Sequence, residues 1–180
     1  MRGIVFTELL EMVEQSYGYD LVDEVLQKVR PTIKGTYTTV GSYPHHEMVQ
    51  ILVLLSQHLG KSVDELMVDY GTYLFGVFSK SYQSFFHEDM DAFAFLSGIE
   101  EKIHPEVRKL YPDAELPSFV IEKYQDDELI LLYESVRCMG AFAHGLIQGC
   151  LHYFNEEADI QMKKLDEKGV RVRFVIRRKA

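Results

Sequence analysis

Residues 118–137, SFVIEKYQDDELILLYESVR, decide the fold class of the second half of the chain. Two runs rich in β-branched, aromatic and other apolar residues, 118–124 and 129–133, flank the turn-forming pair Asp126-Asp127. This pattern predicts a β-hairpin. Every residue from 129 to 132 is apolar, which is typical of a central strand covered on both faces.

The sequence after this hairpin predicts a helix and then a second hairpin. Residues 138–154 have helical spacing, and residues 160–165 and 170–177 are expected to pair around a turn at 166–169. In the last strand, Val172, Phe174 and Ile176 alternate with arginines, so one face should be buried and the other solvated.

Before Pro112 the apolar residues follow a helical period. Those between residues 48 and 59 form one stripe, which Gly60 ends. Ser62 and Glu65 then form a capping box at the start of the next helix. The sequence therefore predicts an α+β fold, with a helical N-terminal half and a C-terminal antiparallel sheet that has a helix packed on it.

Composition sets limits on domain number and partners. The chain has 180 residues, a formal net charge of −9 and 47% hydrophobic residues, so we expect a single domain over 1–180. The negative charge argues against nucleic acid as a partner, and the apolar content argues against disorder. No apolar run is long enough to span a membrane, no signal peptide is recognisable, and Cys138 and Cys150 fit reduced core cysteines in a cytoplasmic protein.

His104 is the first candidate functional residue. It ends a long apolar helical pattern and is followed directly by Pro105, which disfavours a helical conformation at the preceding residue. His104 should therefore lie at a helix boundary or kink. A histidine held beside apolar helices suits an axial ligand of haem iron, but a hydrogen-bonded core histidine fits the same pattern.

The second candidate is a row of polar side chains at the end of the predicted hairpin. In an extended segment Tyr133, Ser135 and Arg137 lie on one face and present a phenol, a hydroxyl and a guanidinium. Such a row suits carboxylate groups, because arginine donates two parallel hydrogen bonds. Polar residues that only form local turns at a strand end are the alternative.

The third candidate is the helix that follows this row. Ala141, Gly145 and Gly149 place small residues at helical spacing, with Phe142 and Leu146 beside them. Glycine within a helix costs up to about 1 kcal/mol relative to alanine, so these glycines need a reason. Either a flat or bulky group packs closely against them, or another helix does.

Together and in this order, these features resemble the H-NOX (haem nitric oxide/oxygen binding) family, in its bacterial stand-alone form, which is related to the haem domain of soluble guanylate cyclase. The resemblance covers essentially the whole chain. It rests on the opening MRGIVF at 1–6, Tyr17-Gly18, 69–71 (DYG), 104–112 (HPEVRKLYP), Leu116-Pro117 and the Y-x-S-x-R motif at 133–137. Pro105 departs from the pattern expected of the family.

The resemblance implies a haem b cofactor buried between the helical half and the sheet, and it implies the residues that hold it. His104 matches the proximal iron ligand, Pro117 matches the proline that presses on the macrocycle, and Tyr133, Ser135 and Arg137 match the propionate clamp. The positions that match the distal pocket are Val5, Leu9, Leu74, Phe78, Phe142 and Leu146. Some relatives have a zinc site near the C-terminus, but 160–180 contains neither Cys nor His, so none is expected.

The resemblance also implies the ligand and the signalling role. Oxygen-binding members place a tyrosine over the iron, whereas this chain has Phe142 there, with apolar Leu9 and Leu74 nearby. We therefore expect NO and CO to bind and O₂ to be excluded. Weakening or breaking of the Fe–His104 bond would signal to a separate protein, a histidine kinase or a cyclic-di-GMP enzyme, since no output domain is recognisable in the sequence.

Two other functions compete with this expectation. A haem enzyme of the peroxidase or oxygenase type needs a distal acid–base group. His144 is the candidate, but it lies about 200° around the helix from Phe142 and should face away from the pocket. We therefore expect no enzymatic activity. An interaction module or apolar-ligand carrier without haem is the other alternative, and it would leave His104 and the Y-x-S-x-R row as coincidence.

Overall fold

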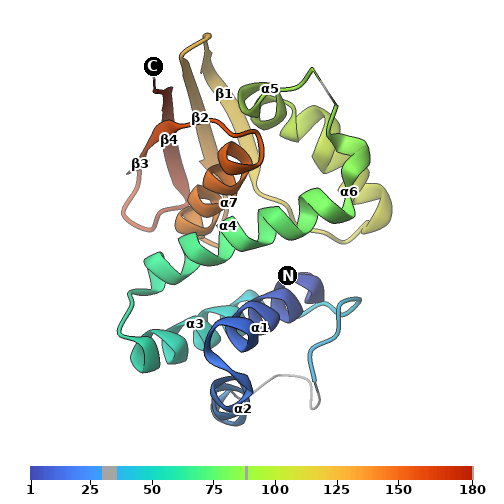
Figure 1. Ribbon diagram of the computed structural model, residues 1–180, viewed down its shortest axis with the longest axis vertical. Coiled ribbons are helices and arrows are strands. Elements are labelled where there is room, and N and C mark those ends of the chain that lie inside the picture. Colours follow the sequence, from blue (N-terminus) through green and yellow to red (C-terminus); the bar gives the residue numbers. More distant parts are fainter. Residues whose placement is uncertain (30–35, 88, 180) are drawn as a thin grey trace. The chain divides into compact units, whose positions relative to one another are not determined.

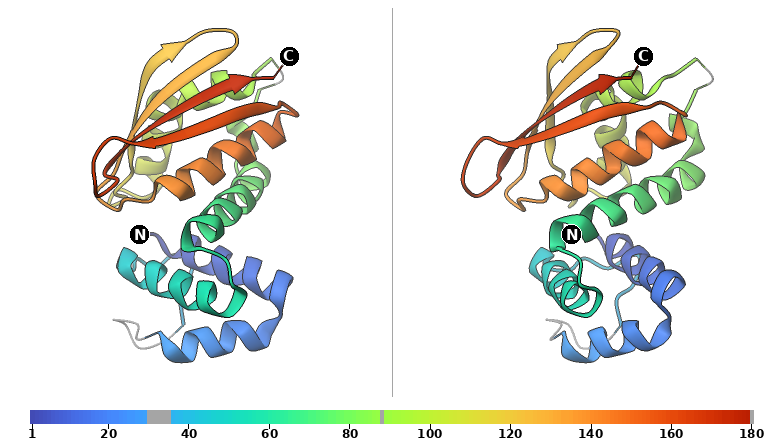
Figure 2. Two further views of the ribbon diagram at one scale, coloured as in Figure 1. Left: turned by 90° about the vertical axis from the view of Figure 1, so that its left-hand side faces the viewer. Right: turned by 60° about the vertical axis from the view of Figure 1, so that its left-hand side comes forward.

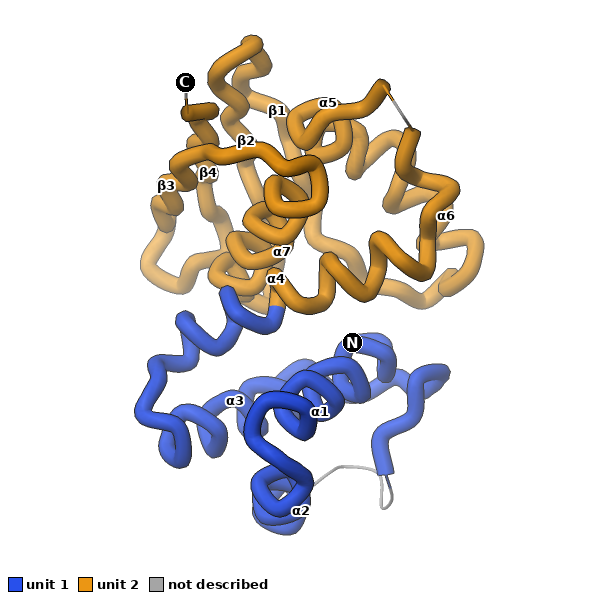
Figure 3. The backbone as a smooth tube through the Cα atoms, in the orientation of Figure 1, with its two compact units in different colours: residues 1–70 blue, residues 71–180 orange. Residues whose placement is uncertain are grey.

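The computed structural model describes residues 1–29, 36–87 and 89–179, which form two compact units, 1–70 and 71–180 (Figure 3). The helices are α1 (Gly3–Tyr17), α2 (Tyr19–Lys28), α3 (His45–Leu59), α4 (Val63–Ser81), α5 (Ala92–Ser97), α6 (His104–Leu110) and α7 (Gly140–Tyr153). A 3₁₀ turn, η1 (Gln83–Phe85), and a π-helical turn, η2 (Ile99–Ile103), lie between them. The strands are β1 (Ser118–Tyr124), β2 (Glu128–Glu134), β3 (Ala158–Lys164) and β4 (Arg171–Arg178) (Figure 1).

Unit 1 is helical and has its own core. Phe6 and Leu9 of α1 are fully buried, as are Ile51 and Leu52 of α3. α3 ends at Gly60, whose φ of 67° is left-handed and therefore favours glycine. The predicted apolar stripe and its stop are both confirmed.

The start of α4 is the predicted capping box. The Ser62 backbone N–H donates to Glu65 Oε2 at 2.7 Å, and the Glu65 N–H donates to Ser62 Oγ at 3.2 Å. These two bonds satisfy donors that the first turn of a helix otherwise leaves unpaired. Residues 63–70 of α4 belong to unit 1, and the rest of the helix belongs to unit 2.

Unit 2 is built on a four-stranded antiparallel sheet in the order β1-β2-β4-β3. The inner face pairs Leu129 with Ile176 and Leu131 with Phe174, and all four side chains are fully buried. Figure 2 shows α7 lying along one face of this sheet. The α+β prediction is confirmed, and β2 is the central strand that its apolar run indicated.

The small residues of α7 serve helix–helix packing within unit 2. A Cβ added at Gly149 would come within 2.6 Å of Phe75 Cβ on α4, and one added at Gly71 of α4 would come within 2.4 Å of the Phe142 carbonyl oxygen. Thr72 Oγ1 also donates to the Gly145 carbonyl at 3.2 Å. Of the two explanations that the sequence left open, these contacts support close approach of another helix.

This packing predicts that replacing glycine by alanine in α4 lowers the stability of the protein at Gly71 but not at Gly76. Gly71→Ala places its methyl group against backbone atoms that cannot rotate away, so we expect a loss of about 1–3 kcal/mol in unfolding free energy. For a chain of this length, the melting temperature should fall by about 2–12 °C. Gly76→Ala is the control, since among the described residues no atom beyond its own helix backbone and chain neighbours lies within 4 Å of its added Cβ. Equal melting temperatures for the two variants would contradict the packing argument.

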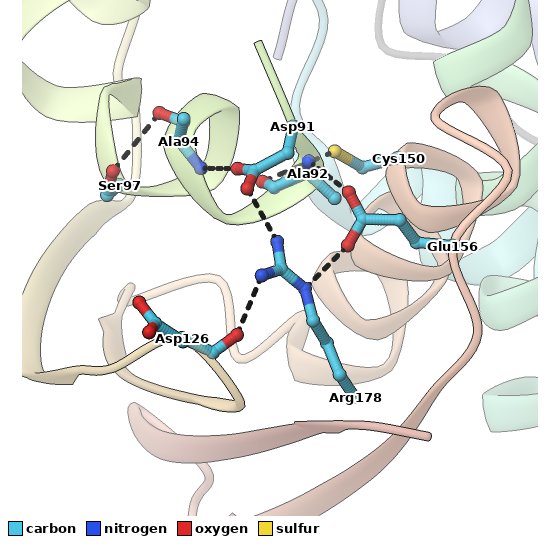
Figure 4. Close-up of polar contacts among 8 residues, drawn as sticks. All are labelled: Asp91, Ala92, Ala94, Ser97, Asp126, Cys150, Glu156 and Arg178. Carbon is cyan, nitrogen blue, oxygen red and sulfur yellow. Dashed lines mark hydrogen bonds and ion pairs between the residues drawn. The ribbon is translucent and has the colours of Figure 1, made fainter. Parts of the chain in front are cut away.

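Arg178, the last residue of β4, connects the sheet with the start of α5 through hydrogen-bonded ion pairs (Figure 4). Its guanidinium donates to Asp91 Oδ2 at 2.8 Å and to Glu156 Oε2 at 2.8 Å, and it lies 4.1 Å from the centroid of the Phe93 ring. Asp91 caps α5 through the Ala94 N–H, and the other oxygen of Glu156 accepts from the α5 backbone. The helices that continue from α5 to residue 110 are thus anchored at their first residue.

Candidate functional site

His104 begins α6, directly after the π-helical turn η2. Its side chain is buried, and Pro105 lies in the first turn of α6. The first turn of a helix has backbone N–H groups without intrahelical partners, so proline is tolerated there. The predicted boundary at His104 is present as the change from the π-helical turn to α6, but the backbone of His104 itself is helical, with φ of −60° and ψ of −38°, despite the following proline.

One ring nitrogen of His104 is held by a carboxylate. His104 Nδ1 lies 3.0 Å from Glu100 Oε1, and the same oxygen accepts a hydrogen bond from the Phe119 backbone N–H at 2.7 Å. Because an ionised carboxylate only accepts hydrogen bonds, Nδ1 is the donor of the pair. The other nitrogen, Nε2, has no hydrogen-bond partner among the described residues. It is therefore available to a ligand.

The surroundings of His104 favour the neutral imidazole. Burial lowers the pKa of His104 below its ordinary value, and this effect outweighs the opposing influence of Glu100. A neutral imidazole is the form that coordinates a metal. The tautomer and the protonation state are thus both those of a metal ligand.

Aromatic rings connect His104 with the polar row at the end of β2. The Phe119 ring centroid lies 6.1 Å from that of His104 and 5.5 Å from that of Tyr133. Pro117 stands immediately before β1 and is half-buried. The Phe119 ring at the beginning of β1 therefore lies beside both His104 and Tyr133.

The polar row is a turn and not an extended segment, which corrects the geometry expected from the sequence. β2 ends at Glu134, and the Cys138 N–H donates to the Ser135 carbonyl at 3.1 Å, closing a tight turn. The Arg137 N–H also donates to Ser135 Oγ at 3.2 Å. The expectation that these side chains lie on one face was wrong, because side chains alternate between two faces only within a strand, and β2 ends at Glu134.

The three side chains still gather at one place. Burial raises the pKa of Tyr133, while Ser135, the Met139 backbone and Arg137 oppose that rise by stabilising the ionised phenol. The influence of Ser135 is that of a hydrogen bond to the phenol, whereas that of Arg137 is the longer-range attraction of its charge. The turn therefore brings together a phenol, a hydroxyl and a cation.

Arg137 already has one carboxylate partner within the chain. Its Nη2 donates to Glu115 Oε2 at 2.9 Å. The Arg137 side chain is 15% exposed, whereas that of Glu115 is 81% exposed. An ion pair with so exposed a partner is weak. The guanidinium of Arg137 can therefore also donate hydrogen bonds to the carboxylate of a ligand.

The distal candidates fall on three helices. Leu74 and Phe78 stand one turn apart on α4, and Phe142 and Leu146 stand one turn apart on α7, all in unit 2. Val5 and Leu9 lie on α1 in unit 1, where Leu9 is fully buried. That these six residues form one pocket stays a prediction.

His144 lies on the sheet side of α7. Its ring centroid is 6.3 Å from that of Phe174 on β4, and it lines a cavity of about 500 Å³ together with Gln148 and Ile160. This position matches the helical spacing, which pointed His144 away from Phe142.

Three residues near the candidate site were missed by sequence reasoning: Glu100, Glu115 and Phe119. Glu100 precedes His104 by four residues, a spacing that permits a side-chain pair but is also common on solvated helix faces. Phe119 is the second residue of β1, two residues after Pro117. For Glu115, 22 residues from Arg137 in sequence, no local signal exists.

Comparisons with known proteins agree on one family. A family model described as Haem-NO-binding matches residues 2–162. An H-NOX protein from K. algicida in the Fe(II) unliganded state is 38% identical, with a TM-score of 0.94 and coverage of 100% of this chain and 97% of that chain. An H-NOX protein from S. oneidensis in the Fe(II)NO state is 25% identical, with a TM-score of 0.91 and complete coverage of both chains.

A curated relative is longer. Soluble guanylate cyclase 89Db of Drosophila melanogaster is 28% identical over 139 residues, which are 76% of this chain and 20% of the cyclase. The chain thus corresponds to about one fifth of that enzyme. Across the residues described, no helix combines the length and the apolar content needed to cross a bilayer.

The fold is that of a family of haem-based gas-sensor domains. The chain belongs to the Haem-NO-binding (H-NOX) family. Its residues fit the family's cofactor: the Nε2 atom of His104 is available, and a cation and two hydroxyls suit propionates. In the described ranges, no group of three or more His, Cys, Asp or Glu residues could hold a metal ion by itself. Haem iron, which the porphyrin already coordinates, needs only one ligand from the protein, such as a histidine.

Proposed function

We propose that this protein is a ferrous-haem sensor that binds NO and CO, excludes O₂ and signals to a separate partner protein. The observation that carries the proposal is the buried His104 imidazole, with Nδ1 held by Glu100 and Nε2 available to iron. The S. oneidensis relative, which has the same fold, is solved in its Fe(II)NO state. We propose haem b as the cofactor.

The proposed roles of the side chains follow from their positions. His104 holds the iron, and Pro117 presses on the macrocycle from the start of β1. Tyr133, Ser135 and Arg137 hold the propionates. The distal wall comprises Val5, Leu9, Leu74, Phe78, Phe142 and Leu146.

Discrimination against O₂ rests on the lack of a hydrogen-bond donor in the proposed distal wall. Its six residues are all apolar, and none of their side chains donates a hydrogen bond. Bound O₂ carries partial negative charge and needs such a donor, whereas NO on ferrous iron needs it much less. A distal acid–base group for peroxidase or oxygenase chemistry is also missing from this set, so we propose that the protein is not an enzyme.

The proposed signal is the release of His104. A gas bound to the haem would weaken the bond to His104, and α6 begins at that residue. His104 is therefore part of a two-state element whose equilibrium the gas shifts and a partner can read. We propose a cytoplasmic histidine kinase or cyclic-di-GMP enzyme as that partner.

Absorption spectroscopy tests the proposal. Purified, reduced protein should show a Soret band that shifts with NO and with CO and stays unchanged in air over minutes. A stable oxy complex would contradict O₂ exclusion. A colourless protein that takes up no haem would favour the interaction module instead.

The propionate clamp makes a separate prediction. Loss of a hydrogen bond between charged groups costs about 1.5–3 kcal/mol, so Arg137→Ala should release haem about 10- to 100-fold faster. Haem transfer to an excess of apomyoglobin measures the rate. Glu115→Gln is the control, because it removes the exposed partner of Arg137 and keeps the guanidinium. Equal release rates for wild type and Arg137→Ala would show that Arg137 does not hold the propionates.

A further inference from the structure

Glu100 joins two parts of unit 2 through a single oxygen atom. Oε1 accepts from His104 Nδ1 at 3.0 Å and from the Phe119 backbone N–H at 2.7 Å. His104 begins α6, whereas Phe119 is the second residue of β1. Glu100 therefore ties the proposed iron ligand to the strand that follows Pro117.

The bridge is specific to one of two adjacent acids. Glu100 and Glu101 are neighbours in η2, but Glu101 is exposed, whereas Glu100 is directed at His104. The side chain of His104 is 9% exposed and that of Glu100 is 31% exposed. Their hydrogen bond is thus partly shielded from water, which makes it stronger than an i,i+4 pair on a helix surface.

A carboxylate on Nδ1 affects the opposite ring nitrogen. It fixes the tautomer and the rotation of the imidazole, and it increases the electron density that Nε2 donates to a metal. Both effects strengthen a metal–histidine bond. The same oxygen also holds Phe119, so a change in the position of His104 strains a hydrogen bond at the start of β1.

From this geometry we propose that Glu100 is a positioning residue that sets the strength of the bond between His104 and the haem iron. The inference rests on the proposed function, because it requires His104 to be the iron ligand. The strength of that bond in turn determines what fraction of the protein loses it when a gas binds, so Glu100 influences this fraction. The hydrogen bond to Phe119 N–H makes the start of β1 the first segment to respond.

Two substitutions separate the charge of Glu100 from its hydrogen bonds. Glu100→Gln keeps an oxygen that can accept from both donors but removes the negative charge. Glu100→Ala removes the bridge entirely. Glu101→Gln is the matched control, since it makes the same charge change on an exposed neighbour in η2.

The first measurement uses haem-free protein. Hydrogen exchange of the Phe119 amide should accelerate in Glu100→Ala and stay near wild type in both glutamine variants. This result establishes the bridge in solution independently of the cofactor. Unchanged protection of Phe119 in Glu100→Ala would show that the bridge does not exist, and it would overturn the inference.

The second measurement uses the ferrous haem protein. The Fe–His stretching frequency in the resonance Raman spectrum should fall from wild type to Glu100→Gln and fall further in Glu100→Ala. Loss of a partner of this kind typically weakens metal binding about 10- to 100-fold, so haem release from Glu100→Ala should be at least about 10-fold faster. The nitrosyl complexes of both variants should contain more of the five-coordinate form than wild type.

The outcomes distinguish failure of this inference from failure of the proposed function. If wild type and Glu101→Gln hold haem through a histidine but Glu100→Gln keeps the wild-type stretching frequency, Glu100 has only a structural role and the inference is wrong. If wild type shows no Fe–His stretch at all, the assignment of His104 is wrong and the inference falls with it. If Glu100→Ala does not fold, the frequency of Glu100→Gln alone decides.

Discussion

His104→Gly should lose ordinary five-coordinate ferrous haem. His104 is the proposed protein ligand, and glycine leaves a space the size of an imidazole at the start of α6. We expect haem to be retained at least about 100-fold more weakly, which corresponds to about 2.8 kcal/mol. The Soret band after reconstitution and transfer of haem to apomyoglobin measure the effect. Added imidazole should restore the five-coordinate spectrum, because it can occupy the vacated position.

A second histidine provides the control for this experiment. His144 also lies in unit 2, where it is half-buried and its ring lies near Phe174 of the sheet. His144→Ala should keep the wild-type haem spectrum. A His104→Gly protein with the wild-type spectrum, before imidazole is added, would rule out His104 as the ligand.

Phe142→Tyr should convert the protein into one that binds O₂. A phenol at this position supplies the hydrogen-bond donor that the six distal residues lack, and a bond to the partial negative charge of bound O₂ contributes about 1.5–3 kcal/mol. Affinity for O₂ should rise about 10- to 100-fold, while affinity for CO, which carries less charge, should change less. Titration with O₂, followed in the Soret band, measures the change.

The control keeps the distal wall apolar. Phe142→Leu changes the shape of the side chain without adding a donor, so it should not gain O₂ affinity. Equal gains in the leucine and tyrosine variants would show that space, and not a hydrogen bond, excludes O₂. No gain in Phe142→Tyr would place Phe142 away from the bound gas.

The parts of the fold that depend on local chemistry could be predicted from the sequence. The Ser62–Glu65 capping box and the stop at Gly60 are decided by side chains within one turn of the backbone they bind. β1 and β2 could be predicted because Asp126-Asp127 separates two runs of strong strand formers. The family follows from residues spread over the whole chain, and the matching fold and family model confirm it.

The π-helical turn η2 could not be predicted. Apolar periodicity over residues 90–103 continues across Gly98, and one additional residue in a single turn changes that pattern very little. The two contacts of Glu100 were missed for another reason. Acidic residues one turn before a histidine usually mark a solvated helix face, and only the position of the Phe119 amide shows otherwise.

The geometry of the polar row needed the structure as well. The sequence groups three polar side chains, those of Tyr133, Ser135 and Arg137, but it gives them an extended backbone, because nothing in residues 133–137 marks Glu134 as the end of the strand. The left-handed backbone of Cys138, with φ of 54°, closes the turn, and cysteine gives no signal for it. Whether these side chains hold haem stays a prediction.

The strand order has a consequence for how the protein is made. β4 is the last strand to leave the ribosome, yet it lies between β2 and β3 in the sheet. Until it arrives, residues 129–132 form an apolar strand with a bare edge, which is prone to aggregation in a nascent chain. The backbone of Ser135 is also held by the Val170 carbonyl, just before β4, at 2.8 Å. The proposed propionate clamp therefore forms only after residue 170 has been made, so a cofactor supplied earlier would meet an incomplete clamp.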